Sequence, residues 1–422
     1  MAHHPKGSPL AKAGILLTAA NVGSGLLGYA YQVLMGRLLT PGDFALFSVF
    51  MALIMLIGSP LSAMLMIVSR EVSALTATSG GNRLRSLYLR SQHQLALASI
   101  IFFTMVGVFI DPIQQWLKSP SKVVILIFSG AMIFSAYFTL NNAFFQGQQR
   151  FVWLGGSIFI GVLLKILLGA LFIALGFGLE GALSGLLVSA AIVWLVGLLF
   201  NLYQMPRGDK KSKQEPNKNG WNRILPVIFA NVAFAAMTQL DMVLVNRYFT
   251  AQEAGLYAAA SVLGKAVLYL PGGLVFALFP MVATNHVTNQ SSRGLLAQAI
   301  LLTSLLCGLA ALMYWFLGEW LIALLYSAHY QGAGELLRWY GLAMIPMALV
   351  MVAEHFLIAK GRILFAWLFL VMAPIQMAAI HYWHENLWNV MATMGLSGSL
   401  LVVLGYGMLL ADLKKSEKGV SV

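Results

Sequence analysis

Long apolar runs separated by short polar segments occupy most of this chain. Six runs lie near residues 11–39, 45–68, 91–110, 123–146, 152–176 and 180–203, and six more near 224–249, 256–284, 295–317, 336–359, 363–381 and 387–411. Each has about the 20 residues that a helix needs to cross a bilayer, and none shows the alternation of barrel strands. The pattern predicts an all-α membrane protein with about twelve transmembrane helices.

The composition supports this prediction. Of 422 residues, 59% are hydrophobic and 9% are charged, whereas soluble domains carry about 25% charged residues. The first apolar run exceeds the roughly 7–15 residues of a signal-peptide core, so we interpret it as a first span. The single cysteine, Cys307, lies inside an apolar run and is interpreted as a packing residue.

Basic residues are unevenly divided between alternate loops, and the formal net charge is +12. If the N-terminus is cytoplasmic, most of the 26 Lys and Arg residues fall in cytoplasmic loops, the central linker and the tails. The positive-inside rule then predicts a bacterial inner-membrane protein with both termini in the cytoplasm. The charge is an orientation signal, and we expect no nucleic-acid partner. The outer side keeps only Arg37, Lys118, Lys122, Arg247 and Arg338.

A polar, basic stretch near the midpoint divides the chain. We predict an N-terminal six-helix bundle at 1–204, a cytoplasmic linker at 205–222 and a C-terminal six-helix bundle at 223–422. The halves are related by a repeat. A shift of 210 residues aligns Asn21 with Asn231, Arg37 with Arg247, Thr40 with Thr250 and Asp43 with Glu253, and a shift of 212 aligns Phe144 with Phe356 and Arg150 with Arg362.

The number of spans in each half predicts how the repeats are related. Six is even, so both halves enter the membrane in the same sense. A parallel pseudo-two-fold repeat of this kind is found in transporters, where the axis lies along the membrane normal. We expect the two bundles to enclose a central cavity.

Three segments resemble a known family. They are GRLLTPGDFALFSVFMALI from Gly36, NRYFTAQEAGLYAAASVLGKAVLYLPGGLVFALFPMVA from Asn246, and the stretch from Leu325 to Arg362. All three are similar to the polysaccharide transporter branch of the multidrug/oligosaccharidyl-lipid/polysaccharide exporter superfamily. Ala45 departs from the first pattern, which usually has Gly there.

The resemblance implies a MATE-like transporter fold and a flippase function. Members of the branch move lipid-linked oligosaccharides or related cell-envelope precursors across the bacterial inner membrane. The expected partners are therefore a polyprenyl-pyrophosphate-linked glycan, the membrane lipids and a coupling ion, H⁺ or Na⁺. We expect no cofactor, no metal site and no catalytic residues.

Four ionisable residues lie inside predicted spans, where charge is expensive and indicates function. Asp241 and Lys265 fall at similar depths, about 12 and 14 Å from the outer end of adjacent helices. One interpretation is a structural ion pair. The other is that Lys265 binds a phosphate and the acid Asp241 limits its attraction for that phosphate. Lys165 is a candidate contact for a pyrophosphate. Glu354 is a candidate ion-coupling residue, as is Asp241, and it could equally pair with a lysine.

Polar residues at repeat-related positions complete the candidate site. Asn21 and Asn231 either line the cavity or make helix–helix hydrogen bonds. Arg37 and Arg247 either anchor helix ends at the outer surface or bind phosphate there. The HYWHE segment from His381 resembles a metal-ligand spacing, but neighbouring tryptophans indicate an interfacial belt.

Two alternative functions remain open at this point. One is an ion-coupled multidrug exporter of the same superfamily, which an excess of intramembrane acids would favour. Two intramembrane lysines balance two acids here, which favours an anionic or zwitterionic substrate. The other is a membrane enzyme acting on polyprenyl-linked glycans. Such an enzyme needs a sizeable loop with an acid, a base and a nucleophile that converge. The longest outer loop, near 318–335, is short and has no such convergent set.

Overall fold

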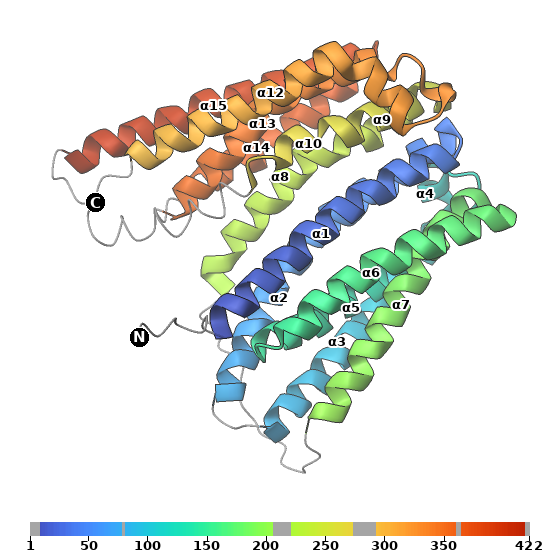
Figure 1. Ribbon diagram of the computed structural model, residues 1–422, viewed down its shortest axis with the longest axis vertical. Coiled ribbons are helices and arrows are strands. Elements are labelled where there is room, and N and C mark those ends of the chain that lie inside the picture. The colour runs from blue at the N-terminus through green and yellow to red at the C-terminus, as the bar shows by residue number, and fades with distance from the viewer. Residues whose placement is uncertain (1–8, 78–80, 206–220, 273–292, 360–363, 418–422) are drawn as a thin grey trace, which may run out of the picture. The chain divides into compact units, whose positions relative to one another are not determined.

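The computed structural model describes residues 9–77, 81–205, 221–272, 293–359 and 364–417. These residues fold almost entirely into helices, with no strand among them (Figure 1). Eight helical stretches within this part of the chain are long and apolar enough to cross a membrane. The predicted all-α class is confirmed, and the protein is an integral multi-pass membrane protein.

Every predicted apolar run contains a helix. The first half holds α1 (Pro9–Leu38), α2 (Pro41–Ala77), α3 (Gly81–Val108), α4 (Ile110–Leu117), α5 (Lys122–Gly147), α6 (Phe151–Phe172) and α7 (Gly178–Gln204). The second half holds α8 (Trp221–Tyr248), α9 (Ala251–Gly264), α10 (Ala266–Tyr269), α12 (Arg293–Leu325), the 3₁₀ turn Ala328–Tyr330, α13 (Ala333–Ala359), α14 (Leu364–Tyr382) and α15 (Leu387–Glu417).

Glycine makes the reversal between α6 and α7. One turn of π-helix, Ile173–Phe177, joins the two helices, and Gly176 and Gly178 adopt φ of 93° and 48°. Positive φ is strained for residues with a side chain, so glycine is suited to both positions. The helices then approach closely, because a Cβ on Gly185 would lie 2.5 Å from the backbone nitrogen of Gly169. Such small-residue contacts are typical of membrane helices.

The described chain separates into two compact units, and the chain changes unit within α2. The first unit takes residues up to Leu39 and from Ile57 through α7, and the second takes Thr40–Leu56 and the residues from α8 onward. Pro60 lies inside α2 and cannot donate to the carbonyl of Leu56, so the helix has a defect at the unit boundary. The predicted linker lies largely outside the described residues, and its bounds stay a prediction.

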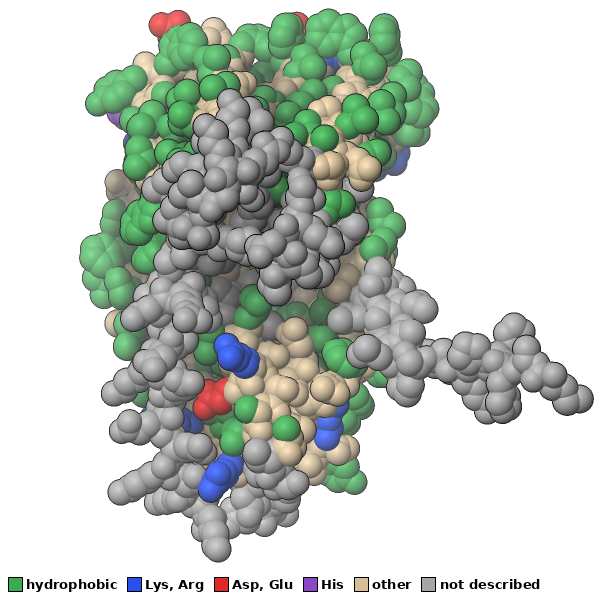
Figure 2. All heavy atoms as spheres, turned by 90° about the vertical axis from the view of Figure 1, so that its left-hand side faces the viewer, with side chains coloured by type: hydrophobic (Ala, Val, Ile, Leu, Met, Phe, Trp, Pro, Cys, Tyr) green, Lys and Arg blue, Asp and Glu red, His purple; other side chains and the backbone are tan. Residues whose placement is uncertain are grey.

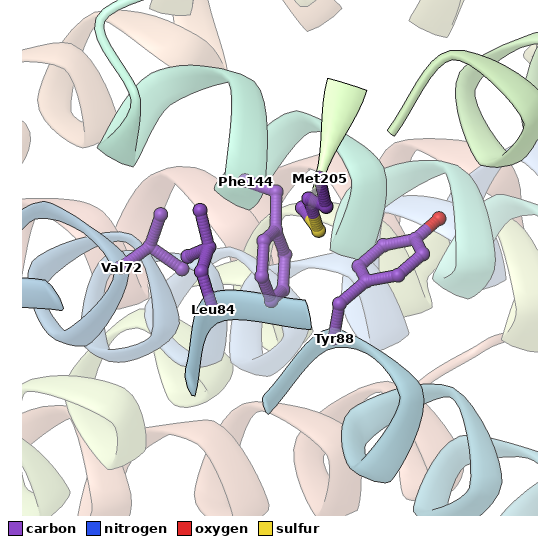
Figure 3. Packing of buried hydrophobic residues seen from close by; sticks show 5 residues of the cluster. All are labelled: Val72, Leu84, Tyr88, Phe144 and Met205. Carbon is purple, nitrogen blue, oxygen red and sulfur yellow. The ribbon is translucent and has the colours of Figure 1, made fainter. Parts of the chain in front are cut away.

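The first unit packs α5 against α7, α6 against α7 and α1 against α6. At one end, α2, α3 and α5 meet in the cluster shown in Figure 3, whose members are Val72, Leu84, Tyr88, Phe144 and Met205. The rings of Tyr88 and Phe144 meet edge to face at 4.8 Å, and the Tyr88 hydroxyl donates to Asn141 Oδ1 at 2.6 Å. The cluster buries this hydroxyl with a partner, as buried polar groups require.

The second unit uses equivalent packing partners. There α13 packs against α15 and α14 against α8, as α5 packs against α7 and α6 against α1 in the first unit. Phe144 and Phe356, which the shift of 212 residues aligns, are both fully buried. The internal repeat therefore has a counterpart in the packing of each unit.

The aligned Thr and acidic residues form the N-terminal caps of two helices, with the acid three residues after the Thr. Thr250 and Glu253 form a capping box at the start of α9, in which each side chain accepts from the other residue's backbone N–H. At the start of α2, Asp43 N–H donates to Thr40 Oγ1 at 3.3 Å, and the hydroxyl donates to Asp43 Oδ2 at 2.9 Å. These caps satisfy backbone groups that a helix leaves unpaired. This part of the repeat thus carries a structural role.

Apolar side chains cover much of the exposed surface. Figure 2 shows hydrophobic side chains across the upper part of the face in view, with few charged side chains among them. On α12, exposed apolar residues recur three or four positions apart, which places them on one face: Leu301, Leu305, Leu309, Leu312 and Phe316. A stripe of this kind would be an aggregation hazard in water and suits contact with lipid.

Candidate functional site

The contact expected between Asp241 and Lys265 is present in the second unit. Asp241 lies on α8 with no exposed surface, and Lys265 lies at the junction of α9 and α10 with 8% exposed. The Lys265 Nζ donates to Asp241 Oδ1 at 3.2 Å. The structure therefore brings together two of the four intramembrane ionisable residues.

Neutral donors and acceptors complete this ion pair. The hydroxyls of Tyr257 on α9 and Tyr340 on α13 both donate to Asp241 Oδ2, at 3.0 and 2.6 Å. The Lys265 ammonium also donates to Gln239 Oε1 at 3.2 Å. Burying two charges is favourable only when their remaining hydrogen-bonding capacity is met. These five residues, hereafter the Asp241 cluster, meet that condition.

A short polar chain links the cluster to an exposed side chain. Gln239 Nε2 donates to the Tyr269 hydroxyl at 3.2 Å and lies 3.4 Å from Met55 Sδ. Tyr269 and Met55 are 41% and 46% exposed. The carboxylate is thus buried, while the buried amide that contacts the ammonium also contacts two exposed side chains of the same unit.

A helix break positions the lysine of the cluster. Just beyond α10, Pro271 has no N–H with which to bond the carbonyl of Val267. The buried Cys307 thiol on α12 donates to that carbonyl at 3.4 Å. On the other side of the break, the Tyr314 hydroxyl donates to the Leu263 carbonyl at 2.8 Å. Side chains of α12 therefore satisfy backbone groups at the break, which gives Cys307 a structural role.

Lys165 lies in the first unit, on α6, and is half-buried. Its Nζ lies 5.0 Å from the centre of the Tyr31 ring, within cation–π range. Tyr31 is fully buried, and its hydroxyl donates to the Ala182 carbonyl at 3.2 Å. Among the described residues, no carboxylate pairs with Lys165. Its ammonium therefore lies against an aromatic face, and no carboxylate in the described part of the chain neutralises it.

Glu354 is a buried carboxyl on α13 with 2% exposed. In the part of the chain that the structure describes, its Oε1 has no hydrogen-bond partner. The shift of 212 residues aligns Glu354 with Asn142, whose Oδ1 accepts from the Ser157 hydroxyl at 2.9 Å. The same shift aligns Ser157 with Phe369, which offers no such donor. The second unit thus has, in place of a hydrogen-bonded neutral pair, an acid with one oxygen that has no partner among the described residues.

The remaining predicted residues do not join these groups. Asn21 is exposed and Asn231 is half-buried. Arg37 and Arg247 lie in the last turns of α1 and α8, where a cation interacts favourably with the helix dipole. Whether any of the four contacts a substrate stays a proposal.

Three members of the Asp241 cluster were not predicted from the sequence. Tyr257, Tyr340 and Gln239 lie in apolar runs, where a lone tyrosine or glutamine resembles ordinary packing. A usable signal was present for Tyr257, because it lies eight residues before Lys265, near two helical turns on the same face. Among the described residues, no three His, Cys, Asp or Glu side chains lie close enough together to hold a metal ion.

The chain is similar to known proteins in sequence family and in fold. A family model described as "Polysaccharide biosynthesis protein" matches residues 10–286. The search of curated proteins found no match.

Solved structures share the fold at low sequence identity. An inward-facing multidrug resistance MATE family transporter of the MOP superfamily has a TM-score of 0.77 and 13% identity, covering 94% of this chain and 96% of that one. The lipid II flippase MurJ in an inward closed conformation has a TM-score of 0.72 and 14% identity, covering 95% and 90%. A MOP superfamily transporter from Pyrococcus furiosus has a TM-score of 0.63 and 13% identity, covering 96% of each chain. These likenesses confirm the MATE-like fold.

Proposed function

Because the chain belongs to the polysaccharide biosynthesis protein family, we propose that it is a flippase of the bacterial inner membrane. Its cargo is a polyprenyl-pyrophosphate-linked oligosaccharide or a related cell-envelope polysaccharide precursor, moved by alternating access. It acts as a transporter rather than an enzyme. The family match and the fold shared with a lipid flippase support the proposal.

The choice of a pyrophosphate-linked cargo rests on the ammonium of Lys165, which no described carboxylate neutralises. A pyrophosphate needs a cation that is not already neutralised, and an ammonium acts as a point-charge partner for it. Lys265 is neutralised by Asp241 at 3.2 Å, whereas no carboxylate in the described residues pairs with Lys165. Lys165 is therefore the primary candidate for the phosphate contact, and Lys265 is the secondary one.

Alternating access avoids exposing the polar head group of this cargo to the hydrocarbon core of the membrane. A glycan head group carries many hydroxyls, and transferring each into hydrocarbon without a hydrogen bond costs several kcal/mol. A hydrated path through the protein removes that cost, while the polyprenyl tail stays in lipid.

The direct test is flipping by the purified protein in vesicles. A lipid-linked oligosaccharide is placed in both leaflets, and a glycosidase added outside measures the fraction that becomes accessible. We expect complete digestion with the protein and about half without it, because spontaneous flipping of so polar a head group is very slow. No difference between the two, together with export of a cationic dye, would favour the multidrug-exporter alternative instead.

Glu354 is the proposed coupling residue. Asp241, the other candidate, has both carboxylate oxygens bonded and a lysine as counter-ion, which leaves it less able to take up H⁺ or Na⁺. The unsatisfied Oε1 of Glu354 suits either ion, because uptake would supply the missing partner or neutralise the charge.

Replacing Glu354 with Gln should separate flipping from its driving force. We expect the wild-type protein to flip faster under an imposed pH or Na⁺ gradient and the Glu354→Gln variant to respond to neither, because the amide cannot be protonated or act as a charged ligand. The measurement is the vesicle assay with each gradient imposed in turn. Asp43→Asn, at an exposed helix cap, is the control. A normal gradient response in Glu354→Gln would exclude this role.

A further inference from the structure

A pocket of about 390 Å³ opens at one end of the second unit. The turn between α8 and α9, the first turn of α13 and the loop between α14 and α15 form its walls. Its size is within the range of about 300–1,000 Å³ that small-molecule sites occupy. The positive-inside distribution of basic residues predicts that this end faces the periplasm.

The charge of the walls excludes phosphate as a ligand. Two carboxylates line the pocket, those of Glu253 and Glu385, and no lysine or arginine does so among the described lining residues. Glu253 is engaged by the Thr250 backbone N–H and hydroxyl, whereas Glu385 lies in an exposed loop segment. A phosphate would meet repulsion here without a basic partner. The ligand is therefore neutral or cationic.

The polar groups of the pocket both donate and accept. The Nδ1 of His384 contacts the carbonyl oxygen of His381, which can only accept, so Nδ1 carries the proton and Nε2 is an acceptor in the neutral ring. The Asn386 Oδ1 accepts from the Asn389 backbone N–H at 2.9 Å, which leaves its amide NH₂ as a donor. Together with the Glu385 carboxylate, these groups can hydrogen-bond the hydroxyls of a ligand, because each hydroxyl both donates and accepts.

Aromatic rings supply the apolar part of the walls, and other rings hold them in place. Tyr248 stacks on His384 with ring centres 4.0 Å apart and an interplanar angle of 22°. Trp388 meets the ring of Trp339 edge to face at 5.9 Å. Rigid aromatic surfaces beside a few polar groups suit an amphipathic ligand.

We propose that this pocket binds a neutral sugar ring of the transported glycan. Trp388 and Tyr248 contact the apolar C–H face of the ring, and His384, Glu385 and Asn386 bond its hydroxyls. This inference rests on the proposed function and adds a second recognition site to it. Glycan recognition is placed at the end of the second unit, and pyrophosphate recognition at Lys165 in the first.

The test uses free ligands on the purified full-length protein in nanodiscs. The probes are maltose, lactose, N,N′-diacetylchitobiose, tetramethylammonium and inorganic pyrophosphate, and saturation-transfer NMR measures binding of each. We expect at least one disaccharide to bind and its affinity to fall roughly tenfold or more in Trp388→Ala, the effect of removing a central aromatic anchor. Glu385→Ala, in an exposed segment, should also weaken binding without threatening the fold.

The matched control is Trp383→Ala. Trp383 lies in the same loop, is 45% exposed and does not line the pocket, so its removal should leave sugar binding unchanged. Binding of tetramethylammonium but no sugar, binding of no probe, or sugar binding that survives both pocket variants would each overturn the proposal.

Failure of this inference is distinguishable from failure of the proposed function. Free sugars can bind whether or not a lipid-linked cargo is flipped. A protein that flips cargo but binds no sugar refutes the pocket alone, whereas one that binds sugar but flips nothing refutes the flippase function alone.

Discussion

Replacing Lys265 with methionine is expected to destabilise the protein by about 3–5 kcal/mol, the range for removing one partner of a buried ion pair. The variant leaves the Asp241 carboxylate with no exposed surface and, among the described residues, with only the two tyrosine hydroxyls as partners. Asp241→Asn should be similarly harmful, because it leaves a buried ammonium uncompensated. The measurement is the midpoint of unfolding of each purified variant in the same detergent.

The double variant decides between a structural and a functional pair. Asp241→Asn with Lys265→Met removes both charges, so a purely structural pair predicts that much of the lost stability returns. The interaction energy from this double-mutant cycle measures the coupling directly. If Lys265→Met instead folds with wild-type stability but loses flipping, the structural interpretation is wrong and the lysine serves the substrate.

The chain contains a matched control pair at its surface. Lys122 Nζ lies 2.6 Å from Asp111 Oδ1, and the two side chains are 51% and 63% exposed. Exposed ion pairs contribute about 0–1 kcal/mol, so Lys122→Met should shift stability little despite the shorter contact. A large effect at Lys122 would show that loss of any lysine, rather than burial, explains the result at Lys265.

Replacing Lys165 with alanine is expected to reduce flipping by roughly tenfold or more, because removing a charge-assisted phosphate contact costs about 1.5–3 kcal/mol. Lys165→Arg should retain most activity, because a point-charge contact depends on charge more than on shape. The measurement is accumulation of lipid-linked glycan on the cytoplasmic face of cells that carry each variant at matched expression.

Tyr31 provides the control for this experiment. Tyr31→Phe keeps the aromatic face 5.0 Å from the Lys165 ammonium and removes only the hydroxyl that donates to Ala182, so flipping should change little. Equal flipping by wild type and Lys165→Ala would remove Lys165 from the site. The anionic-cargo argument would then depend on Lys265 alone.

The sequence alone was sufficient for the features that depend on neighbouring residues. Long apolar runs predicted the helices because the bilayer demands about 20 apolar residues per span. Thr40 with Asp43 and Thr250 with Glu253 marked the repeat because a helix cap forms within one turn. The Asp241–Lys265 contact was also foreseeable, since a short turn joins two helices whose depths can be counted.

Only the tertiary structure decided which distant side chains surround these residues. Tyr340 reaches Asp241 from 99 positions along the chain, and the pocket at Trp388 assembles three separate turns. The change of unit within α2 at Leu56 is likewise invisible in a continuous apolar run. The physical reason is that burial and hydrogen bonding between segments leave no periodic trace in either segment. A tyrosine that donates a hydrogen bond to a buried acid therefore has the same local pattern as one that fills a core.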